Sequence, residues 1–111
     1  CMTIDCVYNT LVRKFLFEEI RVESIQEGRL FHISVRFNPK YDKQPGRGVE
    51  DVIFRNITYE GVGENPSLIK GLDEKRCVRN VTFEQVMING IRMKNINDFV
   101  SNEYIENIKV K

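Results

Sequence analysis

Val49-Glu-Asp-Val-Ile-Phe-Arg-Asn-Ile-Thr-Tyr59 is the stretch that decides the fold, because similar stretches occur before and after it. Its equivalents are residues 12–22 (VRKFLFEEIRV) and Val78–Ile88 (VRNVTFEQVMI), and a truncated copy follows at Ile105–Val110 (IENIKV). The copies start 37, 29 and 27 residues apart. A repeat of this length indicates one structural unit that is stacked several times.

Within each copy, apolar and polar residues alternate, the alternation breaks at polar positions, and a second short alternation follows. A two-residue period is typical of half-buried β-strands, whereas a helix would place apolar residues three and four apart. The Val, Ile, Thr, Phe and Tyr content favours strands as well. A further apolar stretch follows each copy, near Leu30, Leu68 and Ile91. The sequence therefore predicts about three strands in each repeat.

Short strands and a period of 27 to 37 residues predict an all-β fold, a right-handed parallel β-helix in which each coil stacks on the last. We expect residues 1–111 to form a single segment of about three and a half coils. Stacking places equivalent side chains one above another inside the coil. Two sets are expected to stack in this way: Phe17, Phe54 and Phe83, and Ile20, Ile57 and Val86.

Bends and hairpins leave separate signals. Asp51, Asn80 and Asn107 share one repeat position just before a strand, where short polar side chains can hydrogen-bond neighbouring backbone at a bend. The alternative fold is an antiparallel β-sandwich whose repeat is accidental. The two-residue hairpin signal Asn-Gly occurs once, at Asn89-Gly90, which argues against the sandwich.

Composition narrows the possible functions. The chain has 111 residues, with 17 Lys and Arg against 16 Asp and Glu, and a net charge of +1. Nucleic-acid and membrane-surface binders depend on an excess of positive charge, so we expect neither partner. No apolar run approaches the roughly 18 residues that cross a bilayer. The chain begins with Cys1 rather than Met, and we therefore expect the C-terminal part of a longer protein.

The cysteines and the histidine do not form a recognisable site. Cys1, Cys6 and Cys77 make no Cys-x-x-Cys pair, and we expect Cys6 and Cys77 to be small buried residues. His32 lies between two apolar residues on an expected strand, and we interpret it as structural. The scattered positions fit neither the spacing of zinc ligands nor a Cys-His nucleophile. The sequence implies no cofactor and no metal site.

Two expected loops are candidates for a binding surface. Residues 38–48 contain two prolines, two glycines and the basic residues Lys40, Lys43 and Arg47. Residues 61–67 contain two glycines and a proline. Such residues favour loops, and loops on one face of a solenoid often form its binding surface.

The copies at 49–58 and 78–90 resemble the C-terminal coils of the pectin-degrading glycoside hydrolases of family 28, the polygalacturonases, and the likeness covers residues 12–110. The resemblance implies hydrolysis of pectic polysaccharide by paired acidic residues. Family 28 carries these acids in Asn-Thr-Asp and Asp-Asp motifs, followed by Gly-His-Gly and Arg-Ile-Lys. Here Asn9-Thr10 is followed by Leu11, and no Asp-Asp occurs. We therefore expect no catalytic residue in this chain.

The resemblance carries over three substrate-binding residues. Arg92-Met93-Lys94 is the nearest match to Arg-Ile-Lys, which in the family meets the substrate carboxylate. A guanidinium and an ammonium two positions apart on a strand point the same way, which suits an anion. Tyr41 lies in the loop before the copy at 49–59, where the family has a tyrosine that contacts sugar. The competing interpretation is that Arg92 and Lys94 are surface residues of a terminal coil.

Two functions stay open at this point. In the first, the chain is the C-terminal part of a polygalacturonase-like hydrolase, forms one wall of the sugar cleft, and has its catalytic carboxylates upstream of Cys1. In the second, it is a non-catalytic β-helix module that binds carbohydrate or is structural. In both, a coil end with unpaired strand edges predicts that the isolated chain pairs end to end, swaps strands or aggregates.

Overall fold

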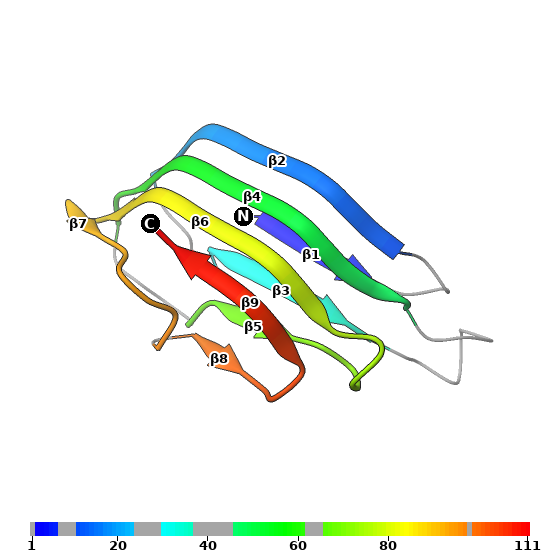
Figure 1. The fold of residues 1–111 in the computed structure, drawn as a ribbon. Helices are drawn as coiled ribbons and strands as arrows, with labels where there is room; N and C mark the ends of the chain where they lie inside the picture. Colours follow the sequence, from blue (N-terminus) through cyan, green and yellow to red (C-terminus); the bar gives the residue numbers. More distant parts are fainter. Residues whose placement is uncertain (1, 7–10, 24–29, 37–45, 62–65, 98) are drawn as a thin grey trace.

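The computed structural model describes residues 2–6, 11–23, 30–36, 46–61, 66–97 and 99–111 (Figure 1). These residues form an all-β fold without helices, so none of them belongs to a helix that could cross a membrane. The strands are β1 (Met2–Cys6), β2 (Leu11–Val22), β3 (Phe31–Val35), β4 (Gly48–Tyr59), β5 (Leu68–Lys70), β6 (Val78–Ile88), β7 (Ile91–Arg92), β8 (Val100–Ser101) and β9 (Ile105–Val110).

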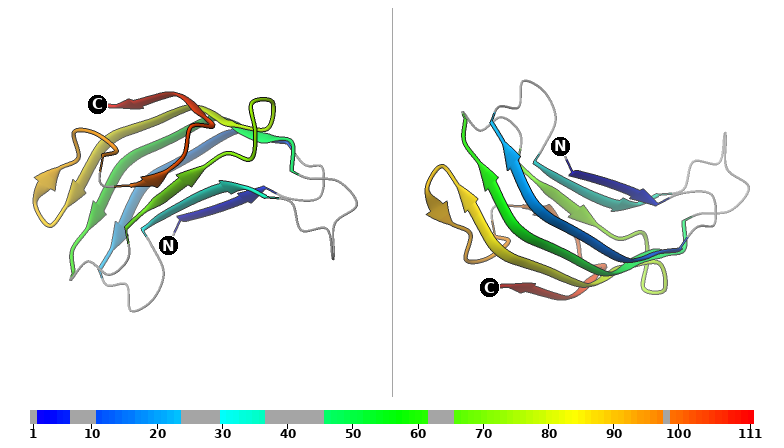
Figure 2. Two further views of the ribbon diagram at one scale, coloured as in Figure 1. Left: turned by 90° about the horizontal axis from the view of Figure 1, so that it is seen from below. Right: turned by 90° about the horizontal axis from the view of Figure 1, so that it is seen from above.

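The strands form two parallel sheets that face each other (Figure 2). We call β1-β3-β5-β8 the short-strand sheet and β2-β4-β6-β9 the long-strand sheet. Apart from β7, which pairs antiparallel with β6, the chain alternates between the sheets, so each new strand lies beside the previous strand of its own sheet. Parallel neighbours need a long crossover connection, and here the opposite sheet is part of that connection. The parallel pairing excludes the antiparallel sandwich.

The predicted repeat is confirmed residue by residue in the long-strand sheet. Val12 pairs with Val49, Val49 with Val78, and Val78 with Ile105. The spacings read from the sequence, 37, 29 and 27 residues, are therefore the lengths of chain between strand partners.

The core lies between the sheets and contains both predicted stacks. The rings of Phe17 and Phe54 are 4.9 Å apart and nearly parallel, and those of Phe54 and Phe83 are 5.1 Å apart. Phe31 of β3 meets Phe54 and Phe83 edge-on, at 4.9 and 5.0 Å, an arrangement that aromatic quadrupoles favour. The second set is also in register and packs in the core: Ile20, Ile57 and Val86.

The long strands bend where left-handed residues interrupt them. At the first bend Asp51, Asn80 and Asn107 have φ of 56°, 54° and 53°, as Lys14 does with 58°. Asn and Asp tolerate this conformation better than most residues do. The bend lies where the sequence predicted it, but the hydrogen-bond partners differ. The Asn80 amide donates to the Asp51 carboxylate at 3.2 Å, and the Asn107 amide donates to Asn80 at 2.7 Å.

A second bend follows five residues later in β2, β4 and β6. It is formed by residues with φ of 57°, 54° and 55°: Glu19, Asn56 and Gln85. Each of these strands therefore consists of straight pieces separated by single left-handed residues, which gives the sheet the curvature seen in Figure 2. The prediction of about three strands per repeat is thus wrong: the pieces on either side of each bend belong to one long strand, and a repeat contributes one long and one short strand.

The prediction for Ile91 is wrong. Leu68 pairs with Val100 of β8, so Val100 and not Ile91 continues the short-strand sheet. Asn89 and Gly90 have φ of 51° and 80°, as a type I′ hairpin requires, and this turn sends Ile91 back antiparallel to β6. The sequence also did not predict β1, which pairs with β3 at the start of the short-strand sheet.

Two asparagines clamp neighbouring connections together. The Asn89 side chain accepts from the Gly61 N–H and donates to the Gly61 carbonyl, both at 2.8 Å. Asn102 does the same with Gly71, at 3.2 and 2.8 Å. A Cβ at Gly71 would lie 2.2 Å from the Tyr104 carbonyl oxygen, so only glycine fits there. Beyond the ends of the strands, these side-chain amides thus give the backbone of Gly61 and Gly71 the acceptor and donor that a neighbouring strand would otherwise provide.

Ile57→Ala should lower the free energy of unfolding by roughly 2 to 5 kcal/mol, because truncating a fully buried side chain leaves a cavity. Ile91→Ala is the matched control. Ile91 is 72% exposed, and a change within about 0.5 kcal/mol is expected. Urea unfolding followed by circular dichroism measures both, and equal effects would contradict this assignment of the core.

Candidate functional site

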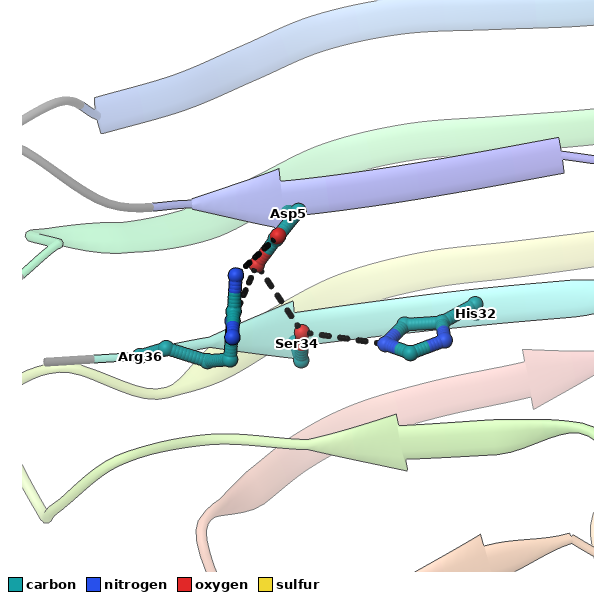
Figure 3. Close-up of polar contacts among 4 residues, drawn as sticks. All are labelled: Asp5, His32, Ser34 and Arg36. Carbon is teal, nitrogen blue, oxygen red and sulfur yellow. Dashed lines mark hydrogen bonds and ion pairs between the residues drawn. The ribbon is translucent and has the colours of Figure 1, made fainter. Parts of the chain in front are cut away.

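A polar cluster lies on the outer face of the short-strand sheet (Figure 3). Asp5 of β1 is the strand partner of Ser34 of β3, and His32 lies two residues before Ser34 on the same face. Arg36 follows β3, and its Nε donates to the Asp5 carboxylate at 2.7 Å. The Ser34 hydroxyl lies 3.4 Å from Asp5 Oδ1 and 3.4 Å from His32 Nε2.

This cluster has the residue types of a Ser-His-Asp triad without its geometry. A triad needs the histidine between the serine and the carboxylate, so that it accepts the serine proton while the acid orients it. Here Ser34 lies in the middle, and Asp5 contacts Ser34 and Arg36 rather than His32. The hydrogen bond from Arg36 lowers the pKa of Asp5, against the desolvation that raises it, so this carboxylate is a poor base. The arrangement fits the structural role expected for His32.

The outer face of the long-strand sheet carries two rows of alternating charge. Glu50 lies between Arg13 and Arg79, 3.7 Å from each guanidinium. Arg55 lies between Glu18 and Glu84, at 3.4 and 3.3 Å. Sequence reasoning missed these rows, although the three residues of each row occupy equivalent positions in the repeat. Exposed ion pairs of this kind contribute little individually to stability.

Neither row forms the acid pair that a glycosidase needs. A general acid has to retain its proton, which a neighbouring guanidinium opposes. Glu18 and Glu84 both contact Arg55, and their hydrogen bonds raise the pKa of Arg55. Within the described ranges, these carboxylates are therefore arranged as partners of arginine rather than as an acid and a base.

The predicted substrate-binding residues Arg92 and Lys94 line one shallow hollow. They are exposed on either side of the buried Met93, at the end of β7. The hollow measures about 390 Å³ and combines cationic and apolar surface from Ile88, Ile91, Arg92, Met93, Lys94 and Asn95. The structure thus brings together two of the three predicted residues. Tyr41 lies outside the described residues, as do Lys40 and Lys43.

A second cationic hollow lies at the opposite end of the long strands. It measures about 330 Å³ and is lined by Leu11, Arg47, Glu50, Lys75, Arg76 and Arg79. Arg47 belongs to the loop at 38–48 that the sequence singled out. The other cations, Lys75, Arg76 and Arg79, come from later in the chain, so only the fold brings them close to Arg47. Arg76 is held by Asp73 at 3.1 Å.

The thiols are part of the core. Cys6 and Cys77 are both buried, as expected, and the Cys6 thiol donates to the Gly48 carbonyl at 3.2 Å. Cys1 lies outside the described residues. Where the structure describes the chain, no three His, Cys, Asp or Glu side chains lie close enough to hold a metal ion.

Asp5→Asn should make the fold less sensitive to acid. The folded-state pKa of Asp5 is below its unfolded value, so the carboxylate stabilises the fold above about pH 4, and this contribution is lost as the pH falls through the folded-state pKa. The variant should unfold at lower urea than the parent chain at pH 7, and the difference should shrink at pH 3. Asp51→Asn, whose carboxylate meets an amide instead of a cation, is the control. A constant difference between the two pH values would contradict the role of Arg36.

Comparison with known proteins adds no assignment: no family model, no curated protein and no solved structure matches the chain. The case for a function therefore depends on the residues and their geometry.

Proposed function

We propose that the chain is a segment of a right-handed parallel β-helix that binds acidic polysaccharide of the pectic type, without carrying out hydrolysis itself. Three features support this. The long and short strands alternate between two sheets, and parallel neighbours keep one constant register. Crossover connections between parallel strands are right-handed in nearly all proteins, which favours a right-handed coil. The repeat also resembles the coils of polygalacturonases.

The observation that carries the proposal is the hollow at Arg92 and Lys94. A uronic acid polymer presents a carboxylate on each sugar, together with the weakly apolar faces of the rings. The two exposed cations suit the carboxylates. The exposed Ile91 beside them offers an apolar surface for a ring.

Local charge rather than overall charge would bring the polymer to this hollow. The chain as a whole has a net charge of +1, so long-range attraction is weak. Arg92 and Lys94 have no carboxylate in contact among the described side chains, whereas Arg13, Arg55 and Arg79 do. Binding at exposed cations should therefore depend strongly on salt.

Arg92→Ala and Lys94→Ala should each weaken the binding of polygalacturonate to the 111-residue chain, by roughly threefold to tenfold, the usual range for a lost charge-assisted contact at a surface. Lys109→Ala, an exposed cation on β9 outside the hollow, is the matched control and should bind as the parent chain does. Affinity electrophoresis in gels that contain polygalacturonate measures the effect. Fully methyl-esterified pectin, which lacks the carboxylates, should not retard the chain. Equal retardation of all three variants would refute the assignment of the hollow.

A polygalacturonase-like hydrolase with its catalytic carboxylates outside this chain is the second candidate. One observation favours it: in the part of the chain that the structure describes, no strand covers the outer edges of β1 and β2. Such edges can accept further coils on the same side.

Both candidates predict that the 111-residue chain alone releases no reducing ends from polygalacturonate, because the described carboxylates form no acid and base pair. An active polygalacturonase assayed in parallel is the control. Measurable turnover by the purified chain would contradict both candidates, whereas binding without turnover would agree with both.

A further inference from the structure

The outer edge of β2 differs from the rest of the long-strand sheet. β2 is the end strand of that sheet, and among the described strands only β4 pairs with it. Its inward side chains are incompletely covered: Phe15 is 50% exposed, while its partner Val52 on β4 is 0% exposed. The neighbouring Leu16 is 51% exposed. The edge therefore combines free backbone groups with exposed apolar side chains.

The other end of the same sheet offers much less. There β6 is followed by β9, which has six residues, and by β7, which has two and runs antiparallel in a hairpin. Short edge strands and hairpins limit pairing with another molecule. The β2 edge, at twelve residues, is the long edge of the described sheet.

If two β2 strands are placed side by side and antiparallel, with the two Leu16 residues opposite each other, their sequences are complementary. Over residues 12–20, reversal about Leu16 places opposite charges across from each other and apolar residues across from each other, whereas Leu11 and Arg21 beyond this segment do not match. The resulting pairs are Arg13 with Glu19, Lys14 with Glu18, Val12 with Ile20, Phe15 with Phe17, and Leu16 with itself.

In this register, side chains that point into the core lie opposite side chains that also point into the core. The buried residues of β4 mark the inward positions of the repeat, and within residues 12–20 their partners on β2 are Val12, Phe15, Phe17 and Ile20. Val22, the partner of the buried Tyr59, lies beyond this segment. The register sets Val12 against Ile20 and Phe15 against Phe17, so inward residues meet inward residues. A slip by one residue would set inward against outward side chains. A register centred on Phe17 would set Arg13 against Arg21, which like charges disfavour.

Backbone shape is compatible with the same pairing. The left-handed residues Lys14 and Glu19 stand two residues before and three residues after Leu16. A two-fold axis through Leu16 therefore matches the bends of the two strands to within one residue. Within the chain, Arg13, Glu18 and Glu19 already contact Glu50, Arg55 and Asn56 of β4. Pairing across the open edge would therefore continue these rows of contacts from one copy into the next.

From this complementarity we infer that two copies of the chain associate through antiparallel pairing of their β2 strands, centred on Leu16. The dimer is isologous, so each pair of opposite charges occurs twice and the two apolar cores become continuous. The inference does not depend on the binding of polysaccharide.

Disulfide trapping tests the register. In a Cys1→Ser background, Leu16→Cys should give a covalent dimer under mild oxidation, because directly opposite residues of antiparallel strands have Cα atoms about 4.5 to 5.5 Å apart, within the range that a disulfide spans. Ile91→Cys, on the hairpin at the other end of the long strands, is the control, because Ile91 is even more exposed than Leu16, at 72% against 51%. Cross-linking of the Ile91→Cys variant that is as fast as that of the Leu16→Cys variant would overturn the inference.

Charge exchange tests the same pairing without a covalent bond. Sedimentation equilibrium should show a reversible dimer of the parent chain. Arg13→Glu should weaken dimerisation roughly tenfold, because it sets like charges opposite each other at two symmetric positions, and Glu19→Arg in the same chain should restore it. Circular dichroism controls for folding of each variant. A parent chain that stays monomeric, and so leaves the edge to a further coil of a longer protein, would overturn the inference, as would a double variant that does not recover.

Discussion

Parallel pairing in one fixed register is the constraint on which the rest of the structure depends. Nearly every residue of β4 lies beside its equivalent in β2 and β6, so one kind of residue has to suit the same position in every repeat. A slip of one residue would turn Phe54 out of the core and bring Arg55 into it. The stacked phenylalanine rings make that slip costly, because Phe54 contacts a ring on both sides and a third ring from β3.

The same register organises the outer surface. Arginine and glutamate alternate from strand to strand, so the stacking that concentrates apolar groups inside separates like charges outside. Three of the six carboxylates of the long-strand sheet, Glu18, Glu50 and Glu84, thereby contact arginines. Further cations gather where the strands end, at Arg92 and Lys94 on one side and at Arg47 and Lys75 on the other. This distribution favours a surface that binds anions over one that transfers protons.

Much of the fold could be predicted from the sequence because the repeat is carried by large residues. The aromatic stack at Phe17, Phe54 and Phe83, the strand partners and the first bend all follow from aligning the copies. Ile91 was misplaced because strands of two or three residues hold too few side chains to set a pattern, and the Asn89-Gly90 turn chemistry was the better guide there. β1 was missed for a related reason: its partner Phe31 is 29 residues away from Met2, in the sheet whose repeat is weakest.

The candidate site was less accessible to sequence reasoning. Arg92 and Lys94 were found because their two-residue spacing is local. The hollow at Arg47 and Arg79 joins residues that are far apart along the chain. Their separation depends on the length of a connection, and the repeat does not fix that length. The contact of Asp5 with Ser34 and Arg36 likewise required knowing that β1 exists.

The unequal lengths of chain between strand partners have a consequence for how such a chain can change in evolution. Between β3 and β4 the connection comprises residues 36–47, whereas between β5 and β6 it comprises residues 71–77, yet the strands on either side stay in register. Length is therefore absorbed outside the sheets, and the entropy cost of a longer loop grows only slowly with its length. Insertions and deletions at these connections can alter the surface from one descendant to another while the stacked interior is inherited unchanged.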